Sequence, residues 1–273
     1  MSLVLAPIFL WGAFLSSGGF DLNFWLGFIA YHIFLYGGSN AYNSYYDKDE
    51  GPIGGLKNPP KVTDGILYLS VLFKLIGLVI SWYINLSFFL VYVVFFILSM
   101  AYSHPYTRLK ADPNFSILTI GLGQGGLAFL AGWFCHTTSI SNIPLFISGI
   151  FTTIFMSMGM YPLTQLYQVE EDRKRNDQTF AVYWGITNSF RFSVICVFLS
   201  SISMLSVLYI RKTYFELILV AIVYLFVLSQ IYYWAKNYQE KDILDNYEKI
   251  MKLNYSNAVG FMAYIIVHVI KII

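Results

Sequence analysis

Nine long apolar runs dominate this sequence of 273 residues, and they constrain its fold more than any other feature. The runs cover residues 3–17, 22–43, 66–83, 86–103, 115–135, 143–168, 188–210, 214–235 and 253–272. A run of about 20 apolar residues can cross a bilayer as an α-helix, and continuous runs lack the alternation of apolar and polar residues that marks a membrane β-strand. We therefore predict an all-α, polytopic membrane bundle of about nine transmembrane helices that forms a single domain over residues 1–273.

The composition excludes several other classes of protein. Hydrophobic residues make up 57% of the chain and charged residues only 12%, which leaves too few polar side chains to cover a water-soluble globule. A net charge of +2 gives no reason to expect a nucleic acid as a partner, whereas membrane lipid is the expected surrounding. Cys135 and Cys196 lie in apolar runs, and we expect both to be small buried side chains without a disulfide or metal role.

The basic residues divide unevenly between the two sets of loops. Only Arg211, Lys212 and Lys271 lie near the loops of one side. The other 14 of the 17 are Lys48, Lys57, Lys61, Lys74, Arg108, Lys110, Arg173, Lys174, Arg175, Arg191, Lys236, Lys241, Lys249 and Lys252. Because Lys and Arg are enriched in cytoplasmic loops, we predict that these 14 face the cytoplasm from a multi-pass protein of the cytoplasmic membrane. Thirteen of the 15 acidic residues share that side, which indicates a polar site there unless the loops merely collect charges.

The ends of the second and sixth runs share one pattern of side chains. The first reads YGGSNAYNSYYDKDE and the second reads YPLTQLYQVEEDRKR. At an offset of 125 residues, the matching pairs are Tyr36 and Tyr161, Asn40 and Gln165, Tyr42 and Tyr167, Asn43 and Gln168, and Asp47 and Asp172. Positions i, i+3 and i+7 share one face of a helix, so each segment is predicted to carry a polar stripe that faces the interior of the bundle. Such a repeat fits two halves of similar fold with a site between them.

More acidic residues follow each stripe, and they point to a metal site. Facing carboxylate clusters repel one another unless a cation lies between them. Oxygen ligands without nearby His or Cys suit Mg²⁺, which also binds the phosphates of a substrate. The expected ligands are Asn43, Asp47, Asp49, Glu50, Gln168, Glu171 and Asp172, with Glu170 nearby. The alternative is a pair of helix ends whose acids are simply solvated.

Basic and aromatic residues accompany these acids. The stretch AYSHPYTRLK after the fourth run supplies Arg108 and Lys110. Arg and Lys beside metal-binding acids are the groups that a departing diphosphate requires, although they can also anchor a protein at lipid headgroups. The tyrosines of both stripes, Tyr36 included, can stabilise an allylic cation through their ring faces. Residues expected to contact the substrate are Asn40, Tyr42, Lys57, Tyr161, Gln165, Tyr167 and Lys174.

These motifs resemble those of the UbiA-type polyprenyl transferase family, and the resemblance covers essentially the whole chain. That family has nine transmembrane helices, Asp-rich motifs at the ends of spans two and six, and a YSxPxxRLK-like stretch after span four. The resemblance implies Mg²⁺-dependent transfer of an isoprenoid chain from a prenyl diphosphate to a small acceptor, often an aromatic ring such as a quinone precursor. It also implies that Asn43, Asp47 and Asp172 belong to the metal motifs and that Arg108 and Lys110 hold the diphosphate.

The sequence departs from the family's pattern at several positions. The first motif is commonly NDxxDxxxD, but Ser44 replaces its second residue and Gly51 stands at its last Asp. In the second motif Gln168 stands where Asp is usual and Asn176 where Gly is common. Three other readings therefore stay open, namely a UbiA-like terpene cyclase, a transporter or ion-binding membrane protein, and a lipid-binding family member without turnover.

The predicted sidedness can be tested by labelling single cysteines in intact cells. A cysteine in place of Lys57 is expected to react only with a reagent that reaches the cytoplasm, and one in place of Lys212 only from outside, because the basic residues divide 14 to 3. Labelling of both positions from the same side would contradict the topology.

Overall fold

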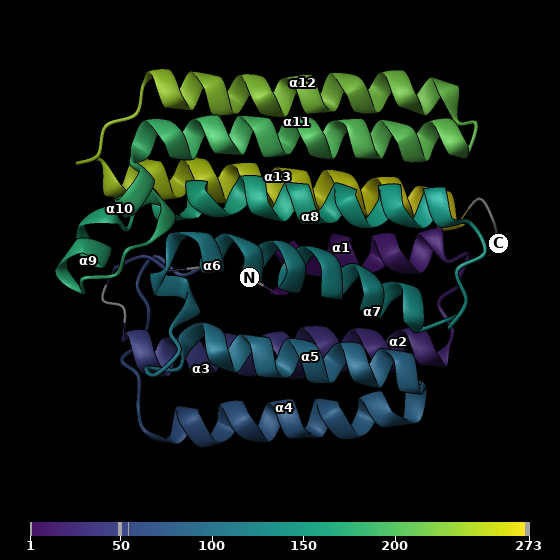
Figure 1. The fold of residues 1–273 in the computed structure, drawn as a ribbon, viewed down its shortest axis with the longest axis horizontal. Helices are drawn as coiled ribbons and strands as arrows, with labels where there is room; N and C mark the ends of the chain where they lie inside the picture. Colours follow the sequence, from purple (N-terminus) through teal and green to yellow (C-terminus); the bar gives the residue numbers. More distant parts are fainter. Residues whose placement is uncertain (1, 49–50, 54, 271–273) are drawn as a thin grey trace. The chain divides into compact units, whose positions relative to one another are not determined.

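A computed structural model describes residues 2–48, 51–53 and 55–270, and most of these residues are helical (Figure 1). The α-helices are α1 (Ser2–Leu15), α2 (Leu22–Ile29), α3 (Tyr36–Asp47), α4 (Gly65–Ile84), α5 (Leu86–Ser103), α6 (Pro113–Thr119), α7 (Ala128–Phe134), α8 (Ile143–Gln165), α9 (Val169–Lys174), α10 (Phe180–Trp184), α11 (Ile186–Ile210), α12 (Tyr214–Lys236) and α13 (Ile243–Ile270). Within the described residues, each of the nine apolar runs is helical over most of its length, and six helical segments are long and apolar enough to span a membrane. The predicted all-α polytopic fold is confirmed.

Side-chain caps fix where several helices begin. Asp21, Asn85 and Asn142 each accept a hydrogen bond from the backbone N–H three residues later, at 2.8, 2.9 and 3.1 Å. Asp112 caps α6 in the same way, and Pro113 follows it at the first helical position. These caps satisfy backbone donors that a helix leaves unpaired at its start, so the short polar loops between apolar runs set the helix boundaries.

Two of the long helical segments contain π-helical turns. Residues Ala30–Leu35 join α2 to α3 without a break, and Ile120–Leu127 join α6 to α7. A π-helical turn adds a residue to the helix and so changes which side chains share a face beyond it. In the first of these segments, the turn directly precedes α3, which carries the first polar stripe.

The chain forms two compact units, and the first contains residues up to Leu109, Leu127–Ser139 and the end of α13 from Tyr255. Small residues let its helices approach closely. A Cβ atom added to Gly132 of α7 would lie 1.9 Å from the carbonyl oxygen of Phe9 in α1, and one added to Gly12 would lie 2.0 Å from that of Phe129. Helices in membranes associate largely through such close backbone packing.

The second unit contains Lys110–Gly126 and Ile140–Asn254. In it, α8 packs against α11, and the Ser200 hydroxyl donates a hydrogen bond of 2.8 Å to the carbonyl oxygen of Thr152. Helices α11 and α12 lie side by side (Figure 1). A buried apolar core that includes Leu163, Val197 and Ile231 fills this unit. This packing holds the end of α8, where the second motif begins.

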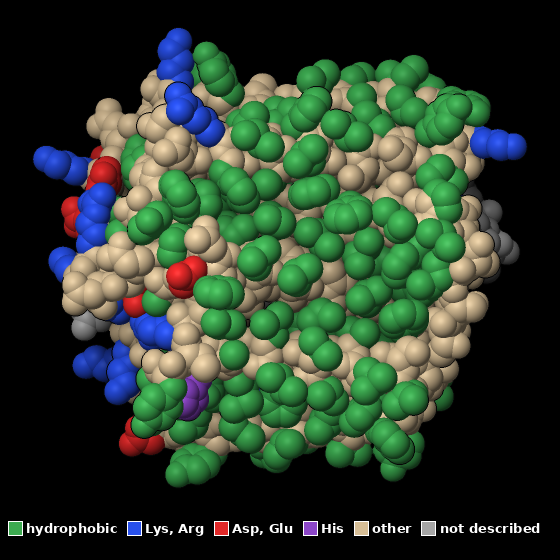
Figure 2. Space-filling model, viewed as in Figure 1, with side chains coloured by type: hydrophobic (Ala, Val, Ile, Leu, Met, Phe, Trp, Pro, Cys, Tyr) green, Lys and Arg blue, Asp and Glu red, His purple; other side chains and the backbone are tan. Residues whose placement is uncertain are grey.

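The two cysteines and most charged residues lie where the composition suggests. Cys135 and Cys196 are buried and free, as predicted. Figure 2 shows hydrophobic side chains along the flanks of the helices and charged side chains gathered near helix ends. Lys74 differs from the charged side chains at helix ends, because it is fully buried near the middle of α4 and not at a membrane boundary. The prediction that Lys74 lies near a cytoplasmic loop was therefore wrong.

The close approach of α1 and α7 gives a test of the fold. Replacing Gly132 by Ala is expected to destabilise the protein by about 1–3 kcal/mol, because the added methyl group collides with a backbone carbonyl that cannot move away cheaply. Replacing Gly260 by Ala is the matched control, since a Cβ there meets no atom within 4 Å. Thermal unfolding in detergent measures both, and an unchanged midpoint for Gly132→Ala would contradict the packing.

Candidate active site

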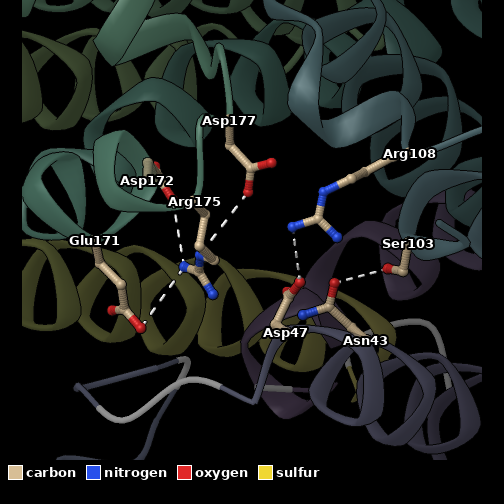
Figure 3. A network of polar contacts seen from close by, with 8 residues as sticks. All are labelled: Asn43, Asp47, Ser103, Arg108, Glu171, Asp172, Arg175 and Asp177. Atoms are coloured by element: carbon tan, nitrogen blue, oxygen red, sulfur yellow. Dashed lines mark hydrogen bonds and ion pairs between the residues drawn. The ribbon is translucent and has the colours of Figure 1, made fainter.

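The first motif lies at the end of α3, which ends at Asp47. Lys48 follows in a left-handed conformation with φ of 50° and closes the helix with a backbone hydrogen bond to Ser44. One turn before the end, the Asn43 side-chain oxygen accepts a hydrogen bond of 2.7 Å from the Ser103 hydroxyl at the end of α5 (Figure 3). This bond orients the Asn43 amide, so its position on the predicted polar stripe is fixed by a second helix.

Asp47 and Arg108 form an ion pair at this end of α3. An Arg108 guanidinium nitrogen lies 3.5 Å from a carboxylate oxygen of Asp47 (Figure 3). The Asp47 side chain is 9% exposed and that of Arg108 is 24% exposed. Arg108 sits in a tight turn after α5, in which its N–H donates to the His104 carbonyl at 2.7 Å. The structure therefore brings together two residues that the sequence analysis assigned to metal and to diphosphate.

The other residues predicted to lie around the first motif have different surroundings. Asn40 is exposed on α3, and Lys57 is exposed in the loop before α4. Tyr36 is buried on α3, where its ring packs against Tyr31 and Phe95.

Tyr42 lies on a different face of α3 from Asp47. Its buried ring lies under the ammonium group of Lys74, at 4.6 Å. The predicted ligands Asp49 and Glu50 lie outside the described residues.

The second motif is not one continuous helical stripe. Helix α8 ends at Gln165, a turn covers residues 166–168, and α9 begins at Val169. The prediction that Gln165, Gln168 and Asp172 share the face of one helix is therefore wrong. The Gln165 side-chain oxygen accepts a hydrogen bond of 3.0 Å from the backbone N–H of Ala181, and this bond holds α10 against the end of α8.

Asp172 is buried in α9 and has two polar partners. The Thr179 hydroxyl donates a hydrogen bond of 3.0 Å to one carboxylate oxygen, and Arg175 lies 3.5 Å from the other. Burial raises the pKa of Asp172 to about 6, and the Thr179 hydrogen bond and the Arg175 charge oppose that rise. A carboxylate that is costly to ionise in isolation has a high affinity for an approaching cation.

Arg175 joins three carboxylates of the second motif. Besides Asp172, it reaches Glu171 at 3.7 Å and Asp177 at 3.9 Å (Figure 3). When all three acids are ionised, one positive charge faces three negative charges and the group carries a net charge of −2. Sequence reasoning missed Arg175, Asp177 and Thr179 as parts of the site. The sequence signal that could have indicated these residues was the polar run NDQT at residues 176–179, which follows the motif and folds back against α9 through a turn.

Lys110 belongs to the same unit as the second motif. It is buried in the short 3₁₀ turn Leu109–Ala111. The Gln178 N–H donates a hydrogen bond of 3.1 Å to the Ala111 carbonyl, so this basic turn is tied directly to the loop that carries Asp177. The geometry therefore places a predicted diphosphate ligand next to the acidic loop.

The remaining residues predicted to lie around the second motif range from buried to exposed. Tyr167 packs into the apolar core, with its ring edge against Tyr247 at 5.2 Å. Gln168 and Tyr161 are half-buried. Glu170 and Lys174 are exposed on α9, and Arg173 beside them forms an ion pair with Glu240.

The oxygen donors of both motifs fit a hard divalent cation. The described residues contain no cluster of three or more His, Cys, Asp or Glu side chains arranged to hold a metal ion by themselves. Mg²⁺ does not need such a cluster, because it keeps several waters and is usually bound by one or two carboxylates together with substrate phosphates. Asp47 with the Asn43 amide, and Asp172 with Glu171, are donor pairs of this kind.

Comparison with known proteins identifies the class. The family model described as the UbiA prenyltransferase family matches residues 5–254. The apo structure of a UbiA homologue from Aeropyrum pernix K1 is similar, with a TM-score of 0.71 at 16% identity over 98% of this chain and 97% of that chain. A UbiA homologue from Archaeoglobus fulgidus bound to DMAPP and Mg²⁺ matches with a TM-score of 0.64 at 16% identity over 96% of both chains.

A third structure, of a digeranylgeranylglyceryl phosphate synthase, matches with a TM-score of 0.67 at 19% identity over 96% of this chain and 92% of that chain. No curated protein sequence matches significantly. The structural likenesses establish the fold, and the family model establishes membership. The chain belongs to the UbiA prenyltransferase family, which makes it a multi-pass membrane enzyme that transfers prenyl groups.

Asn176 shows how one departure from the family pattern is accommodated. It has a φ of 60°, in the left-handed region where Gly is favoured and Asn is the best tolerated of the other residues. Asn176→Gly is therefore expected to leave stability almost unchanged, whereas Asn176→Val should cost about 1–3 kcal/mol. Thermal unfolding of both variants measures the difference, and equal midpoints would contradict a strained turn at this position.

Proposed function

We propose that the chain transfers an isoprenoid chain from a prenyl diphosphate to a small aromatic acceptor, such as a quinone precursor, in a reaction that depends on Mg²⁺. The observation that carries this proposal is the contact between Asp47 and Arg108. A carboxylate suited to a metal ion and a guanidinium suited to phosphate meet at the end of a membrane helix. A guanidinium beside the carboxylate favours a diphosphate-binding site over a cation pathway.

The relatives support the choice of substrate and metal. Homologues from Archaeoglobus fulgidus have been solved with DMAPP and Mg²⁺ and with GPP and Mg²⁺. In this chain, Asn43, Asp47, Gln168, Glu171 and Asp172 would hold Mg²⁺, joined by Asp49 and Glu50, which lie outside the described residues. Bound Mg²⁺ would neutralise the charge that grows on the diphosphate as it leaves.

The reaction breaks the bond between the allylic carbon and the diphosphate oxygen. Arg108 and Lys110 donate hydrogen bonds to the departing diphosphate and stabilise its charge. Tyrosine ring faces stabilise the allylic cation without attacking it as water would. The acceptor ring then forms the new carbon–carbon bond and loses a proton, and inorganic diphosphate is the second product. The uneven division of the basic residues supports the cytoplasmic face as the location of this chemistry.

The experiment uses the purified protein in lipid nanodiscs. With geranyl diphosphate, a hydroxylated aromatic acid and Mg²⁺, it is expected to release inorganic diphosphate and form a prenylated ring, and EDTA is expected to stop both. A cyclic terpene formed without the acceptor would indicate a cyclase. Ion flux through proteoliposomes without diphosphate release would contradict the proposal.

Two carboxylates carry the sharpest test of the site. Asp47→Asn and Asp172→Asn should each lower the rate of diphosphate release by about 100-fold, because an amide keeps the shape but removes the charge that binds the metal. The combined loss should be smaller than the product of the single losses, since both residues would serve the same step.

Asp245→Asn is the matched control for these variants. Asp245 pairs with Lys249 at 2.6 Å on α13 and belongs to neither motif, so its loss should leave the rate unchanged. A near-normal rate for Asp47→Asn or Asp172→Asn, in protein that purifies as a single species, would mean that other residues bind the metal.

A further inference from the structure

A charged residue in the middle of a membrane span demands an explanation. Lys74 lies nine residues after the start of α4 and ten before its end, and its side chain is 0% exposed. Ionisable groups at such a depth are costly and are usually kept for a purpose. Methionine has a similar length and would fill the space without that cost, so packing alone does not account for a lysine here.

The surroundings of the Lys74 ammonium group are unusual. It donates a hydrogen bond of 3.1 Å to the Ser99 hydroxyl of α5, and it lies 4.6 Å from the ring centre of Tyr42 and 5.4 Å from that of Phe96. In the part of the chain that the structure describes, no carboxylate lies within ion-pair distance of it. Aromatic faces therefore supply the negative potential that balances this cation.

The contacts of Lys74 converge on the turn of α3 that carries the first motif. Tyr42, under the ammonium group, directly precedes Asn43 in the sequence. Ser99 and Ser103 lie one turn apart on α5; Ser99 accepts from Lys74, and Ser103 donates to Asn43 at 2.7 Å. Two neighbouring residues of α3 are thus held by side chains of other helices. The Lys74 ammonium group holds Tyr42, and the Ser103 hydroxyl holds Asn43.

The backbone around Lys74 is held in place as well. The Tyr92 hydroxyl donates a hydrogen bond of 2.9 Å to the Lys74 carbonyl, which fixes this turn of α4 against α5. A Cβ added to Gly38 of α3 would lie 2.6 Å from the Ser70 carbonyl and 2.8 Å from Cγ of Lys74. Helices α3 and α4 are therefore in close contact, and a small shift of Lys74 would displace α3 as well.

We propose that Lys74 is a positioning residue, whose cation on the Tyr42 ring fixes the rotation of the α3 turn that presents Asn43 and Asp47. Its consequence for catalysis rests on the proposed function, but its effect on α3 does not. The cation acts from α4 on the ring, the ring fixes the helix, and the helix orients the two oxygen donors. No contact of Lys74 with substrate is involved.

The test measures α3 directly, in ligand-free protein, by hydrogen–deuterium exchange of the peptide that covers Tyr42–Lys48. Lys74→Met should speed exchange there about 10-fold while the thermal midpoint stays level or rises, because a buried charge has been removed. Tyr42→Leu should have the same effect, and Tyr42→Phe, which keeps the ring face, should not. Lys74→Arg keeps the cation and should restore slow exchange.

Two outcomes would overturn the proposal. One is wild-type exchange in α3 for Lys74→Met. The other is faster exchange throughout the chain, including α11 and α12, with a lower thermal midpoint, which would make Lys74 a residue of general stability. If Lys74→Arg does not fold, the comparison of Tyr42→Leu with Tyr42→Phe decides the question. Exchange needs no turnover, so failure of the proposed reaction would show separately, as a wild-type protein that releases no diphosphate.

The same variants extend the test to activity. Diphosphate release by Lys74→Met should fall about 10-fold, and the Lys74→Met/Tyr42→Leu double variant should be no slower than either single variant, because both changes break one contact. Fully additive losses would show that the two residues act independently, which contradicts the proposal.

Discussion

The absence of water from the bilayer core is the constraint on which this structure depends. Every backbone N–H and C=O in that region must find a partner within the protein, and a helix is the way for a single segment to satisfy its own. This is why each apolar run becomes a helix and why polar capping residues such as Asn85 and Asn142 sit where the runs begin. The same constraint moves ionisable groups to the helix ends, where α3 and α9 carry the two acidic motifs.

How far the sequence could predict the site follows from the range of the interactions. Residues within one helix share a face by geometry alone, so Asn43 and Asp47 could be placed together from their spacing. The break after Gln165 could not, because local spacing does not mark it and the partner of the Gln165 side chain is the backbone N–H of Ala181, 16 positions away. Tyr167 was misleading for a similar reason, since its ring packs on Tyr247 of α13. Patterns in sequence report periodicity, and tertiary contacts decide where a helix stops and what a ring faces.

Lys74 shows the same limit when the surroundings of a charged residue are predicted from sequence. Counted by distance from a loop it resembled an anchoring lysine, and only its neighbours Tyr42 and Ser99 reveal a buried cation. The motif residues Ser44 and Gly51, which lack the usual acids, make such supporting contacts more important. Fewer negative ligands leave the remaining ones with a larger share of the metal's charge, so their orientation matters more.

The second motif carries its own cation in the ligand-free protein. Without Arg175, the carboxylates of Glu171 and Asp172 in α9 would face that of Asp177 in the loop that follows, and repulsion would favour opening of that loop. Arg175 balances part of this charge through long contacts of 3.5 to 3.9 Å, which are weaker than close ion pairs. Under the proposed function, Glu171 and Asp172 would hold Mg²⁺, which would supply the positive charge that Arg175 supplies to these oxygens in the ligand-free protein. The planar donors of the Arg175 guanidinium would then be available to phosphate, so that one arginine would serve both the empty and the loaded site.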